Sequence, residues 1–130
     1  MNYLLDTHIF LWALISPAKL SERCKEILMH YEEVYISPIV FWEISLKYAL
    51  GKITLKGVKP EDLLSKTNDL KLKTLDFKSE DALSFYKLPK HHTDPFDRML
   101  VWQAIRNNLA LISHNSQLQH YESEGLKLIW

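Results

Sequence analysis

The sequence has little cysteine, glycine, proline or net charge and no long apolar run, and each shortage excludes a class of protein. Cys24 is the only cysteine, so no internal disulfide can form, and a reducing cytoplasm is the expected location. Three glycines and five prolines beside 47% hydrophobic residues exclude collagen-like and disordered chains. The longest uncharged apolar stretch, residues 8–18, is shorter than the ~20 residues of a membrane helix. Asp6 interrupts the N-terminal apolar run, which argues against a signal peptide.

The charges cancel, because 16 basic residues face 16 acidic ones. Proteins that coat nucleic acid or membranes usually carry a basic excess, so composition alone argues weakly against such partners. The positions of the acids are more informative than their number.

Short apolar runs alternate with segments of helical spacing along the whole chain. Such alternation predicts parallel strands covered by helices, and we expect a single α/β domain over residues 1–130. Its architecture should be a three-layer α/β/α sandwich with a central, mostly parallel five-stranded sheet. The expected strands are 3–5, 34–36, 72–77, 109–112 and 126–129. The expected helices cover 8–14, the segment after Ser21, 38–50, 60–70, 79–86, 94–108 and 115–124.

Capping residues mark several of these helix ends. Serine, or a polar residue followed by proline, predicts a helix start, and glycine after an apolar stretch predicts a helix end. The expected starts are Ser21, Ser37-Pro38, Ser79 and Asp94-Pro95, and the expected ends are Gly51 and Gly125.

Asp6 directly follows the first expected strand. Ligands of parallel sheets bind beyond the carboxyl ends of the strands, so Asp6 is a candidate site residue. The alternative is that Asp6 only caps the helix after it.

Glu43 is placed among apolar residues of its expected helix. Ile39, Trp42 and Leu46, together with Ala49 and Leu50, form a stripe at helical spacing that contains Glu43. A buried carboxylate must be paired, hydrogen-bonded or metal-bound. Glu43 is therefore either a site residue or the partner of a cation such as Lys47, one turn later.

Asp94 and Asp97 begin another expected helix. Both can stabilise its positive end, and Asp94 is first of all a cap. Asp97 also aligns with Leu100, Val101 and Ala104, so we expect it to point inward as a site residue.

Asp6, Glu43 and Asp97 thus form a candidate metal set of hard oxygen ligands. Carboxylates without cysteine or a close histidine pair suit Mg²⁺ or Mn²⁺ better than Zn²⁺. Clustered carboxylates repel unless a cation neutralises them, and such a metal can activate a water to attack a phosphodiester. If these three and Asp94 gather in a cleft, the remaining surface is mildly basic.

Three motifs in this order resemble the PIN domain family, most closely its VapC-like branch of toxins from bacterial toxin–antitoxin pairs. The motifs are Leu4-Leu5-Asp6-Thr7-His8, then Ser37-Pro38 with Trp42-Glu43-Ile44, then His92-Thr93-Asp94-Pro95-Phe96-Asp97-Arg98 with Gln103-Ala104. The resemblance covers essentially the whole chain.

The resemblance implies a Mg²⁺- or Mn²⁺-dependent endoribonuclease that cleaves RNA with a metal-activated water. It implies a small VapB-like antitoxin as partner and a homodimer, and no membrane partner. The family acids fall on Asp6, Glu43 and Asp97, with Asp94 as an additional acid of this branch. Thr7 matches a hydroxyl residue that could hold Asp6 or a water.

The chain departs from the family where a fourth acid often follows the fourth strand. Residues 111–118 contain Ser113 and Asn115 but no acid. This favours an alternative function, a catalytically attenuated PIN scaffold that acts by binding antitoxin or RNA. A phosphotransfer protein with Asp6 as nucleophile is a third hypothesis, weakened because no second acid adjoins Asp6.

Other side chains are supporting candidates with competing interpretations. Arg98 could bind a phosphate or pair with Asp94 or Asp97. His8 and His114 follow strand ends and could line the cleft. The helical aromatics, among them Trp12, Trp42 and Trp102, are expected in the core or a dimer contact, with base stacking as the alternative.

Overall fold

A five-stranded parallel sheet forms the centre of the protein. The computed structural model describes residues 1–30 and 33–130. The strand order is β3-β2-β1-β4-β5, and every neighbouring pair is parallel. The strands are β1 (Tyr3–Leu5), β2 (Val34–Ile36), β3 (Lys73–Thr74), β4 (Ala110–Ile112) and β5 (Lys127–Ile129). The predicted five-stranded parallel sheet is therefore confirmed.

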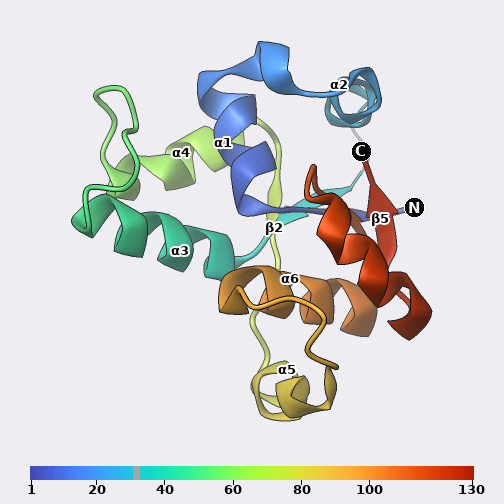
Figure 1. Ribbon diagram of the computed structural model, residues 1–130. Helices are drawn as coiled ribbons and strands as arrows, with labels where there is room; N and C mark the ends of the chain where they lie inside the picture. Colours follow the sequence, from blue (N-terminus) through green and yellow to red (C-terminus); the bar gives the residue numbers. More distant parts are fainter. Residues whose placement is uncertain (31–32) are drawn as a thin grey trace.

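Helices cover both faces of this sheet. In Figure 1, α1 and α2 lie above the sheet, and α6 and α5 lie below it. The α-helices are α1 (Thr7–Ile15), α2 (Glu22–Met29), α3 (Pro38–Ala49), α4 (Leu63–Asp69), α5 (Ser79–Ser84) and α6 (Pro95–Arg106). Short 3₁₀ helices are η1 (Pro17–Lys19), η2 (Pro60–Asp62), η3 (Phe85–Lys87) and η4 (Ser116–Glu124).

The sheet reverses its winding direction between β1 and β4. From β1 the chain moves outward through β2 to β3, then returns to the other side of β1 for β4 and β5. Such a switch point opens a crevice beyond the carboxyl ends of the two strands. Asp6 follows β1 and Ser113 follows β4, so both residues stand at this crevice.

Most predicted caps are confirmed. The side chains of Ser21, Ser37 and Asp94 accept hydrogen bonds from backbone N–H groups of the helices that they begin. Gly125 has φ of +101°, which suits a residue without a Cβ at the end of η4.

Two local predictions are wrong. The strand expected over 72–77 is paired only at residues 73–74, because β3 is an exposed edge strand that bonds to β2 alone. Ser79 is the first residue of α5 rather than its cap, since Lys78 takes the N-cap position. The short helix expected over 115–124 is present as a 3₁₀ helix capped by Asn115.

The core lies on the central strands and the helix faces that cover them. Leu4, Leu5, Leu111 and Ile112 are fully buried, as are Phe10 and Leu100 on opposite layers. The central strands are apolar throughout because helices cover both of their faces. Among the described residues, no helix has the length and apolar character needed to cross a membrane.

Candidate active site

Asp6 is held at the start of α1 by hydrogen bonds on both sides of the switch point. Its Oδ1 accepts the Ile9 N–H at 2.9 Å, and its own N–H donates to the Ile112 carbonyl at 3.1 Å. The side chain of Ser113 also hydrogen-bonds to it. Asp6 therefore caps α1, as one interpretation of the sequence predicted, and still faces the crevice.

The Asp6 carboxyl is an unusually weak acid. Burial raises its pKa to about 6, against the hydrogen bonds from Ser113 and Ile9, which lower it. The negative charge of Asp97 raises the pKa further. A cation bound beside such a carboxyl would stabilise its charged form and lower its pKa.

Asp97 lies in the first turn of α6 and is half-buried. Burial raises its pKa, and the charges of Asp94 and Glu43 act in the same direction. His92 opposes them through a 3.1 Å contact between its Nε2 and Asp97 Oδ2. Asp94 caps α6 by accepting the N–H groups of Phe96 and Asp97 at 2.8 and 3.1 Å.

Glu43 is almost inaccessible, and both of its oxygens are hydrogen-bonded. The side chain is 2% exposed. Thr7 Oγ1 donates to Glu43 Oε1 at 2.5 Å, and Lys47 Nζ pairs with Oε2 at 2.5 Å. The salt bridge that the sequence left open as an alternative is thus present. Thr7 holds Glu43 rather than Asp6, which corrects the role expected for this hydroxyl.

The predicted apolar stripe of α3 is wrong, although Glu43 is buried. Trp42 is 61% exposed, and Leu46 and Leu50 are also exposed. Glu43 instead shares a buried face with Ile39, Val40 and Ile44. Because α3 is apolar on both faces, its periodicity could not show which face meets the protein.

Lys47 adds one positive charge to the acidic cluster. Burial lowers its pKa, but the hydrogen bond and charge of Glu43 outweigh this, and the pKa is raised. Asp94 and Asp97 contribute to the same shift. Lys47 therefore interacts electrostatically with three of the four predicted acids.

An open pocket of about 260 Å³ adjoins Asp6 and Asp97. Its lining residues are Asp6, His8, Trp12, Asp97, His114 and Asn115. The structure thus brings together Asp6, Asp97 and Asn115 from the predicted site, and His8 and His114 line the cleft as expected. Glu43 does not line this pocket but is connected to it by its hydrogen bond to Thr7, the residue next to Asp6.

The residues present suit a divalent cation held by two carboxylates. Mg²⁺ commonly binds one or two carboxylates and takes its other ligands from water and substrate phosphate. Asp6 and Asp97 offer hard oxygens to one pocket, and burial raises the pKa of both carboxyl groups. Within residues 1–30 and 33–130, no three Asp, Glu, His or Cys side chains are arranged to hold one ion.

Ser113 and Asn115 connect the end of β4 to η4. Ser113 Oγ accepts the Asn115 N–H at 3.1 Å, and Asn115 Oδ1 accepts the Gln117 N–H at 3.1 Å. Ser113 thus supports Asp6, while Asn115 caps η4 at the rim of the pocket.

Arg98 does not join the acids. Its guanidinium donates to the Leu88 carbonyl at 3.0 Å and lies 4.7 Å from the centre of the Phe85 ring. The ion pair with Asp94 or Asp97 is therefore wrong, whereas the phosphate contact stays a prediction. Arg98 ties α6 to η3.

Sequence reasoning missed two residues of the site. The sequence gives His92 no role of its own, although it lies five residues before Asp97 and its ring contacts that carboxylate. Trp12 was assigned to the core or a dimer contact, yet it lines the pocket. Its place on α1, less than two turns after Asp6, was a usable signal.

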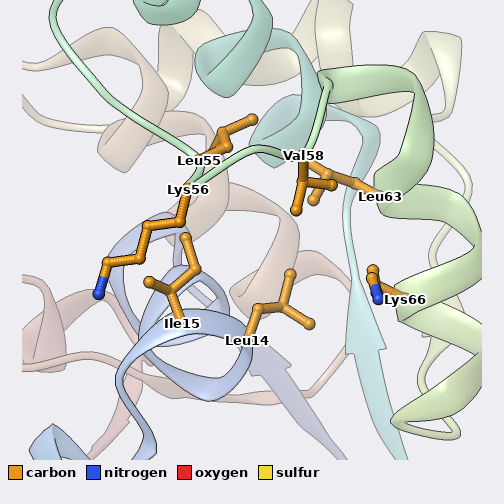
Figure 2. Close-up of a pocket in the computed structure, with 7 residues that line it drawn as sticks. All are labelled: Leu14, Ile15, Leu55, Lys56, Val58, Leu63 and Lys66. Carbon is orange, nitrogen blue, oxygen red and sulfur yellow. The ribbon is translucent and has the colours of Figure 1, made fainter.

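A second cavity, of about 250 Å³, is chemically different. Figure 2 shows Leu14 and Ile15 of α1 on one side of it and Leu55, Val58 and Leu63 on the other. Lys56 and Lys66 complete the lining. No carboxylate lines it, so the metal-type chemistry belongs to the pocket at Asp6.

Comparison with known proteins identifies the family. Residues 3–124 match the PIN domain, and the chain belongs to this family. No curated protein matches the sequence.

Solved structures with the same fold include VapBC and FitAB. A chain of VapBC2 from Rickettsia felis, bound to a DNA fragment from their promoter, is 23% identical with a TM-score of 0.71. The match covers 99% of this chain and 98% of that one. VapBC-1 from nontypeable Haemophilus influenzae gives 21% identity, a TM-score of 0.68 and coverage of 99% and 97%. FitAB bound to an IR36 DNA fragment is 17% identical with a TM-score of 0.66. That match covers 98% of this chain and 93% of the FitAB chain.

Proposed function

We propose that this chain is a metal-dependent endoribonuclease, the toxin component of a VapBC-like toxin–antitoxin pair. The observation that carries the proposal is the pair Asp6 and Asp97 facing one open pocket at the switch point of the sheet. Membership of the PIN domain family supports it, because nucleases that use divalent metal ions are general in this family. The proposal treats residues 1–130 as one PIN domain.

Asp6 and Asp97 would hold Mg²⁺ or Mn²⁺. The bound ion would stabilise charge on a phosphate and activate a water for attack on the RNA backbone. Ser113 orients Asp6 through its hydrogen bond, and His92 orients Asp97. Asp94 caps α6 and adds negative charge beside Asp97.

Glu43 is the third acid of the proposed catalytic set, and its role as a metal ligand remains a prediction. Its two oxygens bond to Thr7 and Lys47, so a metal at Glu43 would have to displace the Lys47 ammonium. We propose that, as long as no cation replaces the Lys47 ammonium, Glu43 affects the pocket indirectly, by positioning Thr7 and Lys47 through its two hydrogen bonds.

We also propose a small antitoxin as the protein partner. The similar VapBC and FitAB structures are complexes, and two of them, VapBC2 and FitAB, are bound to DNA. A homodimer is proposed as well, because Trp42, Leu46 and Leu50 expose an apolar face of α3 that the fold leaves uncovered. Sedimentation of the purified chain tests the dimer, and a monomer at micromolar concentration would contradict it.

The nuclease proposal is tested with labelled single-stranded RNA and protein freed of any copurified partner. We expect cleavage in Mg²⁺ or Mn²⁺ and none in chelator. Asp6→Asn and Asp97→Asn should each slow cleavage by at least roughly 100-fold, since each removes a carboxylate charge from the pocket. Asp76→Asn, an exposed acid in the 75–78 loop, is the matched control and should cut normally. A wild type that cuts no RNA, or an Asp6→Asn variant equal to it, overturns the proposal.

The second candidate function is a PIN scaffold that binds without cutting. Two observations favour it: Asn115 stands at the pocket where a fourth acid would add charge, and Lys47 already neutralises Glu43. Calorimetry separates the candidates. Absence of Mg²⁺ and Mn²⁺ binding, together with intact RNA or partner binding, would favour the scaffold.

A further inference from the structure

Three aromatic rings form a cluster beside the carboxylate pocket. Trp12 comes from α1, His114 follows β4, and Trp130 follows β5. Ring centroids are 5.7 Å apart for Trp12 and His114, 5.1 Å for His114 and Trp130, and 5.9 Å for Trp12 and Trp130. Each ring therefore contacts both others, although they come from three separate segments.

The rings of this cluster keep surface open to solvent. Their planes meet at 51° to 57°, so no ring lies flat against another. Trp130 is 37% exposed, His114 is exposed and Trp12 is half-buried. Three neighbouring aromatic rings that remain accessible offer several differently oriented π faces to a ligand.

The cluster is continuous with the proposed catalytic pocket. Trp12 and His114 line that pocket together with Asp6 and Asp97. His114 and Trp130 also line an adjoining pocket of about 440 Å³. A ligand could thus extend from the carboxylates across the rings without leaving the protein surface.

Polar and cationic groups surround the rings. The adjoining pocket is completed by Ser113, Ser116, Gln119 and Leu128, three of which carry hydrogen-bonding side chains. Lys19 Nζ lies 5.8 Å from the centre of the Trp12 ring. Rings for stacking, polar groups beside them and a nearby cation are the combination that binds single-stranded nucleic acid.

We propose that the cluster of Trp12, His114 and Trp130 binds an unpaired nucleobase next to the phosphodiester that is cut, with one ring stacked on the base and the neighbouring rings packed against its edge. The inference rests on the proposed nuclease function and extends it to substrate choice. A base inside a duplex cannot stack on these rings, so the enzyme should select RNA that is single-stranded at the cleavage site. Gln119 and Ser116 stand where the edge of that base would meet hydrogen-bonding groups.

The test measures RNA binding separately from cleavage. Binding of a labelled 12-nucleotide unstructured RNA is followed by fluorescence anisotropy in chelator, with every protein in the Asp6→Asn background to prevent cutting. The same sequence is offered as a perfect duplex and as a strand with abasic sites. Trp130→Ala and His114→Ala should each weaken binding of the unstructured RNA by roughly 5- to 100-fold, the usual range for loss of one stacked base.

Two further variants control for folding and for general loss of an aromatic ring. Trp130→Phe retains a stacking ring and should bind within about threefold of its parent. Tyr86→Ala removes an 80%-exposed ring from η3, away from the pocket, and should bind normally. The alanine substitutions should weaken binding of the abasic strand and of the duplex much less than binding of the unstructured RNA.

The outcomes distinguish this inference from the nuclease proposal. If Trp130→Ala and His114→Ala bind the unstructured RNA as tightly as their parent, the stacking surface is overturned, even when Asp6 is essential for cutting. The stacking surface is also overturned if these two substitutions weaken the binding of a protein partner but not the binding of RNA. When the native Asp6 is retained and Mg²⁺ is supplied, RNA cleavage by the alanine variants should show a raised KM and a smaller change in kcat. A wild type that binds by stacking but never cuts would overturn the nuclease proposal alone.

Discussion

Removing the positive charge of Lys47 should make the acidic cluster dependent on a divalent cation. Lys47→Met keeps most of the side-chain length but leaves Glu43 without its ion-pair partner. In the native protein Lys47 Nζ and Glu43 Oε2 are 2.5 Å apart, and Glu43 is 2% exposed. The Lys47 charge also interacts electrostatically with Asp94 and Asp97. The substitution therefore raises the negative potential at the pocket.

The size of the effect follows from burial. Leaving one member of a buried ion pair without its partner costs about 3–5 kcal/mol. The Lys47 side chain is 31% exposed, so solvent already screens part of this pair. We expect the free energy of unfolding in chelator to fall by about 1–3 kcal/mol. Glu43→Gln combined with Lys47→Met should recover part of the loss, because no unpaired charge remains.

Urea denaturation with and without Mg²⁺ is the assay. A cation bound only by the folded chain, present at about 100 times its dissociation constant, adds about 2.7 kcal/mol to stability. Lys47→Met should bind Mn²⁺ roughly tenfold more tightly than wild type, because one repelling charge is gone. Lys52→Met, an exposed residue just beyond α3, is the matched control and should behave as wild type.

Two results would refute this reasoning. The first is an unfolding free energy of Lys47→Met in chelator that equals that of Lys52→Met. The second is weaker binding of Mn²⁺ by Lys47→Met than by wild type, which would mean that Lys47 supports the cation rather than opposing it.

Three more predictions concern acidity and stability. Because burial raises the pKa of Asp6 to about 6, the metal-free folded state binds the Asp6 proton more tightly than the unfolded state. Urea unfolding should therefore show the stability of wild type falling by about 2 kcal/mol between pH 4 and pH 6 relative to Asp6→Asn, and equal slopes would contradict this. Ser113→Ala removes a hydrogen bond that lowers this pKa, so Mn²⁺ binding followed by calorimetry should require higher pH, whereas the exposed Ser116→Ala should leave the midpoint unchanged. Arg106→Ala should destabilise by about 2 kcal/mol in urea unfolding, more than Asp81→Ala, because it leaves the buried Asp81 carboxylate without its 3.1 Å partner; the reverse order would contradict this account.

The central part of the fold could be predicted because its signals are local and agree. The runs that became β1 and β4 are apolar throughout, as strands covered on both faces require. The caps at Ser37 and Asp94 are each followed by proline, which fixes a helix start within one residue. Asp6 and Asp97 were found for the same reason, since one ends a strand and the other begins a helix.

Features set by distant contacts could not be predicted. The strand expected over 72–77 is shortened because only β2 is available as a neighbour. The face of α3 that carries Trp42 looked like a core face, although Glu43 and Ile44 are the residues that pack inward. A helix with apolar residues on both faces does not reveal which one meets the sheet.

Partner choice within the site was also ambiguous in the sequence. Lys47 could be weighed as the partner of Glu43 because the two are four residues apart. Thr7 lies 36 positions from Glu43, and their hydrogen bond depends on the packing of α1 against α3, which the sequence alone does not show. Arg98 turned away from the acids because the Leu88 carbonyl and the Phe85 ring lie on its side of α6.

The most direct test of the central claim is a crystal structure with Mn²⁺ and an uncleavable RNA analogue, measured for anomalous scattering. The account predicts a Mn²⁺ peak bonded to carboxylate oxygens of both Asp6 and Asp97 and to a phosphate oxygen of the RNA. A peak elsewhere, or RNA whose phosphates avoid this pocket while Mn²⁺ is bound, would contradict it.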